Sequence, residues 1–218
     1  MRVVSVVAGL LLSGASQAAI VSDNSITGTT VNDFNAFVSG NVVDTISQTG
    51  ATYGEAFAGQ TVSSDVNGYD TLSGSPTVPL TLTAAASAAD NIGIAPFGGG
   101  QVIRGDSGGG AVSILFDAAT DVFGLEVVGD DSGAFTVDFF GTSGGLLGSV
   151  TQSTSDGFFG FSSTGTDILG VSITNTDVGG LGYDNVTFNS AVAPIPLPAG
   201  LPLLLAGLGG LALLRRRS

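Results

Sequence analysis

The chain contains no cysteine, histidine, tryptophan or lysine among its 218 residues. Without cysteine, the chain must fold without disulfide bonds. Without histidine, the chain lacks the commonest general base, the commonest catalytic zinc ligand and the imidazole of a Ser-His-Asp triad. Any catalysis would therefore rest on carboxylates. The absence of tryptophan also removes a common aromatic platform for a sugar ring.

Positive charge is almost confined to the two ends of the chain. All 18 Asp and Glu residues lie within residues 19–190, where Arg104 is the only basic residue, so this stretch carries a net charge of −17. Nucleic acid is excluded as a partner because phosphate binding needs clustered Lys and Arg. An anionic membrane surface is disfavoured for the same reason. Divalent cations and neutral glycans remain open, and the simplest role of the charge is solubility.

The C-terminal tail, residues 191–218, has three parts in a fixed order. Prolines at 196 and 198 precede the uncharged residues 199–214, and three arginines follow. As a helix, this uncharged span would measure about 24 Å, slightly less than a hydrocarbon core. The sequence therefore predicts a transmembrane helix with its arginines in the cytoplasm and the rest of the protein outside. A plain membrane anchor and a buried hydrophobic helix are the alternatives.

This tail resembles the PEP-CTERM family of sorting signals, in its VPLPA variant. The resemblance is carried by the motif and the basic stop: Ile195-Pro196-Leu197-Pro198-Ala199 and Arg215-Arg216-Arg217. Ile195 stands where the family usually has valine. The resemblance implies a Gram-negative exported protein that is processed near the motif by a membrane exosortase. The product would then be released or attached at the cell surface.

The N-terminus is typical of a secretory signal peptide. A short basic region, Met1-Arg2, precedes an apolar segment at residues 3–12 and a run of small residues ending at Ala18. Ser16 and Ala18 fit the −3 and −1 positions of a cleavage site, which places the cut between Ala18 and Ala19. We therefore expect a signal helix at residues 1–18, an exported domain at residues 19–190 and the sorting tail at residues 191–218.

The exported domain reads as a series of short strands separated by Gly, Ser, Asp and Asn. Before the tail, no segment shows a convincing helical period. Regular short strands with glycine-rich turns predict an all-β, antiparallel sandwich or barrel. The expected strands are residues 78–84, 111–116, 122–128, 135–139, 146–151, 168–173 and 183–188, with less regular structure before residue 75.

Residues 111–188 also resemble the jelly-roll domains common in PEP-CTERM proteins, which are similar to carbohydrate-binding modules. The resemblance rests on strand order and on loose motifs such as Phe158-Phe159-Gly160-Phe161 and Gly182-Tyr183-Asp184-Asn185-Val186. It implies a jelly-roll-like β-sandwich and transfers no site residue. Phe135, Phe139, Phe158 and Phe161 are expected to fill the sandwich core.

Two serines match nucleophile patterns. Ser107, in Gly-Asp-Ser-Gly-Gly, matches the nucleophile loop of chymotrypsin-like proteases, and both Ser107 and Ser143 match G-x-S-x-G. Each lies in a glycine-rich turn, and no imidazole exists to accept the serine proton. We therefore expect no catalytic residue in the chain.

Three aspartates are candidate calcium ligands. Asp184 follows Gly179-Gly180-Leu181-Gly182-Tyr183, which fits one nonapeptide of the calcium-binding β-roll pattern, although a single copy cannot complete such a site. Asp130 and Asp131 are adjacent in a turn. Ca²⁺ takes six to eight oxygen ligands from carboxylates and carbonyls. The alternative for all three residues is an ordinary role in a solvated turn.

Three functions remain open. The first is a non-enzymatic protein of the cell surface or of an exopolysaccharide or biofilm matrix, with an exosortase as its processing partner. The second is a released module that binds glycans, and the third is a carboxylate-based glycoside hydrolase, which needs two acids in one cleft. Paired acids in a cleft would favour the hydrolase, an exposed tyrosine on a concave face the glycan binder, and a smooth acidic sandwich the matrix protein.

Overall fold

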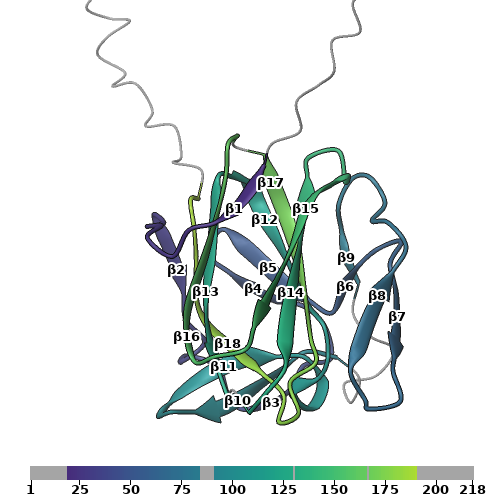
Figure 1. Ribbon diagram of the computed structural model, residues 1–218, viewed down its shortest axis with the longest axis vertical. Helices are drawn as coiled ribbons and strands as arrows, with labels where there is room; N and C mark the ends of the chain where they lie inside the picture. The colour runs from purple at the N-terminus through teal and green to yellow at the C-terminus, as the bar shows by residue number, and fades with distance from the viewer. Residues whose placement is uncertain (1–18, 84–90, 130, 166, 191–218) are drawn as a thin grey trace, which may run out of the picture.

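A computed structural model describes residues 19–83, 91–129, 131–165 and 167–190 (Figure 1). Within these residues the chain is all-β, with two antiparallel sheets that face each other across one hydrophobic core. The predicted β-sandwich is thereby confirmed. The expected signal helix and transmembrane helix lie outside the described residues. Among the described residues, no helix has the length and hydrophobicity that a membrane crossing requires.

Most of the strands belong to one of two large sheets. The first sheet has the order β1 (Ile20–Ser22), β16 (Gly157–Ser163), β13 (Val122–Val128), β18 (Gly182–Phe188), β11 (Gly100–Arg104), β10 (Gly93–Phe97) and β3 (Gly40–Asn41), and β2 (Thr30–Asn32) also pairs with β18. The second sheet has the order β15 (Leu146–Ser153), β14 (Ala134–Gly141), β17 (Ile168–Asn175), β12 (Val112–Thr120), β5 (Ala51–Gly54) and β4 (Ile46–Gln48).

Two small ribbons complete the fold. The strand β6 (Ala56–Phe57) pairs with β9 (Leu82–Thr83), and β7 (Thr61–Ser64) pairs with β8 (Asp70–Ser73). Both lie at the side of the sandwich in Figure 1. A 3₁₀ turn, η2 (Asp106–Gly108), connects β11 to β12.

The chain crosses repeatedly between the two sheets from β11 onward. In that stretch the first sheet is paired as β11-β18-β13-β16 and the second as β12-β17-β14-β15. Only β14 and β15 are consecutive strands of the same sheet. Each of the other turns must therefore pass from one sheet to the other at an end of the sandwich.

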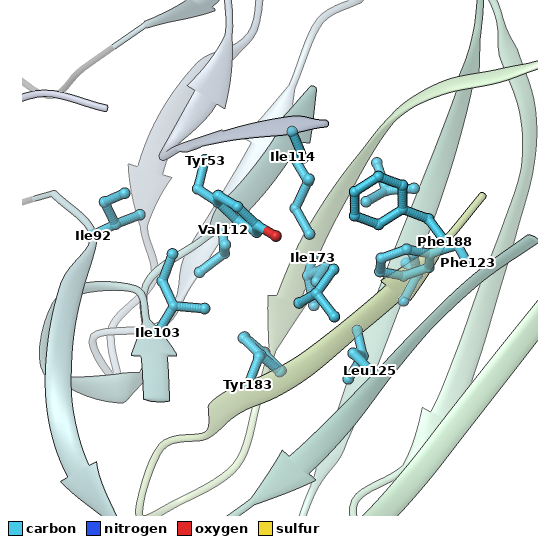
Figure 2. Close-up of a cluster of buried hydrophobic side chains, with 14 of the residues drawn as sticks. Tyr53, Ile92, Ile103, Val112, Ile114, Phe123, Leu125, Ile173, Tyr183 and Phe188 are labelled. Carbon is cyan, nitrogen blue, oxygen red and sulfur yellow. The ribbon is translucent and has the colours of Figure 1, made fainter. Parts of the chain in front are cut away.

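The core lies between the sheets and follows the two-residue alternation of each strand. In β13, Phe123, Leu125 and Val127 are fully buried, whereas Glu126 points away and is half-buried. Figure 2 shows Phe123 and Leu125 together with Ile114 and Ile173 of the opposite sheet, which belong to the same buried cluster. Each fully buried side chain of this size contributes about 1.5–3 kcal/mol.

Three of the four phenylalanines expected in the core are there, and the fourth is not. Phe135, Phe139 and Phe161 are fully buried. Phe158 is only half-buried, and the prediction for it was wrong, because it precedes Phe159 and alternation turns it to the outer face of β16. On that face its ring lies over Gly124, where a Cβ atom would come within 2.5 Å of the ring.

Both described termini lie at one end of the sandwich, at the top of Figure 1. Ile20 pairs with Ser163, and the Asn189 side chain donates a 2.7 Å hydrogen bond to Asp121 Oδ1 in the turn that precedes β13. At the opposite end, which we call the distal end, four turns between the sheets gather: residues 105–111, 129 with 131–133, 154–156 and 176–181.

Candidate functional site

The distal end contains a pocket of about 370 Å³, which we call the distal pocket. This volume falls in the range of small-molecule sites. Strands β10 and β11 contribute Phe97, Val102 and Arg104, and the neighbouring turns contribute Asp131 and Asp156. The pocket thus joins one aromatic ring, the only basic side chain of residues 19–190 and two carboxylates.

Asp177 fixes the shape of the turns around this pocket. Its side chain is fully buried, and its Oδ2 accepts hydrogen bonds from the backbone N–H groups of Asp131 (3.1 Å) and Ser132 (3.0 Å). Its Oδ1 accepts the N–H of Gly179 at 3.0 Å. Several backbone donors around one buried carboxylate satisfy its charge, so Asp177 is a structural residue rather than a free ligand.

Glycines form the floor of the distal pocket because the chain segments approach closely there. A Cβ atom on Gly182 would lie 2.5 Å from Val102 Cγ2, and one on Gly179 would overlap the carboxylate of Asp131. Gly180 has a φ of +78°, and a Cβ atom on this residue would lie 2.7 Å from the backbone of Gly108. The glycine-rich segment 179–182 therefore makes room for the pocket, and its likeness to a calcium motif has this packing explanation.

The charged side chains of the pocket differ in their contacts with the rest of the protein. Asp156 Oδ1 accepts the backbone N–H of Gly129 at 2.9 Å, which ties the β15–β16 turn to the β13–β14 turn. Asp131 lies over Gly179. Arg104 is half-buried, and within the described part of the chain its guanidinium forms no hydrogen bond or ion pair.

Phe97 projects from a tight hairpin at the rim of the pocket. It pairs with Gly100 across a two-residue turn, Gly98-Gly99, in which both φ angles are positive, as this type of hairpin requires. The Phe97 side chain is 45% exposed and points toward Gly129, where a Cβ atom would lie 3.6 Å from its ring. Phe97 therefore presents an exposed aromatic ring from the end of the β10–β11 hairpin.

A second hollow of about 310 Å³ lies beside the distal pocket and shares Gly179 and Gly180 with it. Its lining includes Tyr69 and Ser107. Asp70 of β8 connects the β7–β8 ribbon to the turn before β12. Its buried carboxylate accepts hydrogen bonds from the Ser64 hydroxyl at 2.8 Å and from the Ala111 N–H at 3.1 Å.

Of the three tyrosines, only Tyr69 is partly exposed. Tyr53 and Tyr183 are core residues, and burial raises the pKa of both hydroxyl groups well above the ordinary value. Asn32 Nδ2 donates to the Tyr53 hydroxyl at 2.9 Å. Neither of these two rings can serve as a platform for a ligand.

The two serines that match nucleophile patterns lie at opposite ends of the sandwich. Ser107 is exposed in the η2 turn with a φ of +50°, and its hydroxyl donates to Asp106 Oδ1 at 3.2 Å. Ser143 is exposed in the β14–β15 turn, among the turns of the opposite end. A carboxylate is a weak base for a serine hydroxyl, so neither arrangement reproduces a nucleophile with an activating imidazole.

The structure separates two of the three candidate calcium ligands. Asp131 lies in the distal turns, whereas Asp184 lies on the outer face of β18, directly across from Glu126 of β13. Burial raises the pKa of Asp184, and the charges of Glu126 and Asp33 raise it further. Asp130 lies outside the described residues. Across the described ranges, no three acidic side chains come together as a metal site would require.

The residues of the sorting and cleavage predictions also lie outside the described ranges. These are Ala18 of the signal cleavage site, the motif at 195–199 and the basic stop at 215–217. No protein-family model matches the chain, and comparisons with curated proteins and with solved structures give no match.

Proposed function

We propose that the protein is an exported, non-enzymatic component of the cell surface or of an exopolysaccharide or biofilm matrix, sorted by an exosortase-type enzyme. The observation that carries the proposal is the order of motif, apolar span and basic stop at residues 195–217. The apolar N-terminal segment at residues 3–12, followed by small residues up to Ala18, supports export because this order is typical of a secretory signal peptide. In this proposal the C-terminal helix is a temporary anchor in the inner membrane.

The strand order supports a jelly roll as the fold of the exported domain. A jelly roll has eight strands in two sheets, with the first, eighth, third and sixth strands in one sheet and the second, seventh, fourth and fifth in the other. Counted from β11, the orders β11-β18-β13-β16 and β12-β17-β14-β15 follow this pattern. We propose that β11 to β18 form the jelly roll and that the earlier strands extend it.

The positions of the termini support a surface role. Ser190 leaves the sandwich beside the turn that precedes β13, and the distal pocket lies beside the turn that follows β13. At about 3.3 Å per residue, this strand separates the two by roughly 20 Å. A domain held at a surface through the residues that follow Ser190 would therefore present its distal end outward.

A glycoside hydrolase is the less favoured alternative, although Asp131 and Asp156 both line the distal pocket. Such an enzyme needs one carboxyl group that stays protonated as the general acid. Asp131 and Asp156 are both exposed, whereas a carboxyl group that acts as a general acid near neutral pH lies in apolar surroundings. In addition, Asp156 already accepts a backbone N–H. These features support a site that binds without hydrolysis.

Mass spectrometry of surface-exposed or secreted protein from the native host tests the proposal. We expect an N-terminus at Ala19 and the loss of residues 201–218. The same spectrum would reveal any group attached near Ala199. Surface-exposed protein that retained Arg215, Arg216 and Arg217 would overturn the proposal.

A further inference from the structure

Arg104 is unusual because, among the residues that the structure describes, it has no partner in a strongly acidic domain. It is the only basic residue among residues 19–190, and Asp131 and Asp156 line the same pocket. Even so, the guanidinium has no hydrogen-bond or ion-pair partner within the part of the chain that the structure describes. A guanidinium has five N–H donors and no acceptor, and those of Arg104 are therefore available to a ligand.

Asp131 supplies the opposite chemistry in the same pocket. An ionised carboxylate only accepts hydrogen bonds, whereas a guanidinium only donates them. A hydroxyl group does both, so neighbouring hydroxyls on one ring can bind Arg104 and Asp131 at the same time. An anionic ligand would be repelled by two carboxylates and by the overall charge of the domain, which favours a neutral ligand.

Phe97 adds an apolar surface at the rim. Its ring is 45% exposed and is held by the Gly98-Gly99 hairpin. A pyranose ring has an apolar face of C–H groups that packs against an aromatic ring, while its hydroxyls point sideways. Apolar and aromatic walls with a few placed polar groups are the usual composition of a ligand site.

From these three features we infer that the distal pocket binds a neutral pyranose unit of a glycan, with its ring on Phe97 and its hydroxyls between Arg104 and Asp131. The inference deepens the proposed function and rests on it for its biological setting, because it names what the outward-facing end would bind. Binding itself is measurable on purified protein and does not require that sorting takes place.

The test uses the full chain purified in a detergent that has no sugar headgroup. Ligand-observed NMR screens glucose, galactose, mannose and their β-linked disaccharides, with glucuronate and galacturonate as acidic counterparts. Calorimetry then measures the Kd of each sugar that binds. Phe97→Ala removes the platform and Arg104→Gln removes the charged donor. Leu146→Ala is the matched control, because Leu146 is 51% exposed and starts β15 at the opposite end.

We expect at least one neutral sugar to bind, and each pocket substitution to raise its Kd about tenfold or more. The Leu146→Ala control should leave the Kd within about twofold. Circular dichroism confirms that the variants are folded. The inference is overturned if no neutral sugar binds, if binding survives both pocket substitutions, or if the uronates bind more tightly than the neutral sugars. None of these results bears on processing at residues 195–199.

Discussion

The carboxylate of Asp177 accepts the backbone N–H of Asp131 at 3.1 Å, which joins two turns that cross between the sheets. The first turn connects β13 to β14, and the second connects β17 to β18. One buried side chain thereby sets the relative positions of the segments that line the distal pocket. The charge of Asp177 is offset by the backbone N–H groups around it.

Replacing Asp177 with alanine should destabilise the fold. The substitution removes the acceptor of three backbone N–H groups and leaves these part-buried donors without this partner. The expected loss in the free energy of unfolding is about 2–4 kcal/mol. Urea denaturation measures it. Asp117→Ala is the control, because Asp117 is exposed on β12 and should change stability little; equal losses in both variants would contradict the structural role of Asp177.

Asp184 should make the stability depend on pH in a predictable direction. Burial raises its pKa, the charges of Glu126 and Asp33 add to this effect, and the hydrogen bond from the Asn185 N–H opposes it. A raised folded-state pKa means that Asp184 favours folding below its unfolded pKa. This contribution is lost as the pH rises through the folded-state pKa. At neutral pH the ionised side chain is therefore a destabilising group.

Asp184→Asn should raise the melting temperature at pH 7 and have little effect at about pH 3, where the carboxyl group of the wild type is protonated. Asparagine keeps the acceptor for the Asn185 N–H. Thermal melts of both proteins across this range give the difference. Asp117→Asn corrects for the removal of one negative charge from an exposed site. A gain that is equal at both pH values would contradict the prediction.

Salt should stabilise the protein. Residues 19–190 carry a net charge of −17 with Arg104 as the only cation, so their charges repel one another at low ionic strength. Raising NaCl from 0.01 M to 0.15 M shortens the screening distance from about 30 Å to about 8 Å. We expect the melting temperature to rise over this interval. An unchanged melting temperature would show that the repulsion is not significant.

The same melts test the calcium prediction when CaCl₂ and MgCl₂ replace NaCl at equal ionic strength. A specific site would add stability beyond the effect of ionic strength, because a ligand that binds only the folded state stabilises it. Loss of this increment in Asp184→Asn would identify Asp184 as a ligand. Loss in Asp131→Asn would instead place the site in the distal turns. Coincident melting curves would attribute the whole effect to screening.

The sequence predicted the later strands of the fold well. The expected strand at residues 122–128 has the same limits as β13, and those at 168–173 and 183–188 fall within β17 and β18. These strands are rich in β-branched and aromatic residues, and glycine-rich segments follow β13 and precede β18. By contrast, of the expected strand at 78–84 only Leu82–Thr83 is a strand among the described residues. Pro79 interrupts the segment because proline cannot donate to a sheet.

The candidate site was harder to predict because its residues are brought together by strand pairing. Asp177 is separated from Asp131 by 46 positions, and no local pattern links them. Phe97 and Arg104 meet Asp131 only because β11 pairs with β18 and β18 pairs with β13. One signal was visible in the sequence, since Arg104 is the only basic residue of the exported segment.

The sorting prediction can be tested with substitutions in the motif. Pro196→Ala combined with Pro198→Ala removes both prolines and leaves the apolar residues 199–214 and the arginines unchanged. We expect the unprocessed protein to remain in the inner membrane, because the span then acts as an ordinary anchor with its arginines inside. Membrane fractionation and mass spectrometry of the C-terminus measure this outcome.

Ile195→Val is the matched control for the motif. It replaces Ile195 with the residue usual in the family that the tail resembles, so processing should proceed as in the wild type. A folded exported domain in both variants separates a sorting defect from a folding defect, and urea denaturation compares their stabilities. If the double proline variant were processed and released like the wild type, the prolines would not be part of a recognition motif, and residues 191–218 would have to reach their final location by another route.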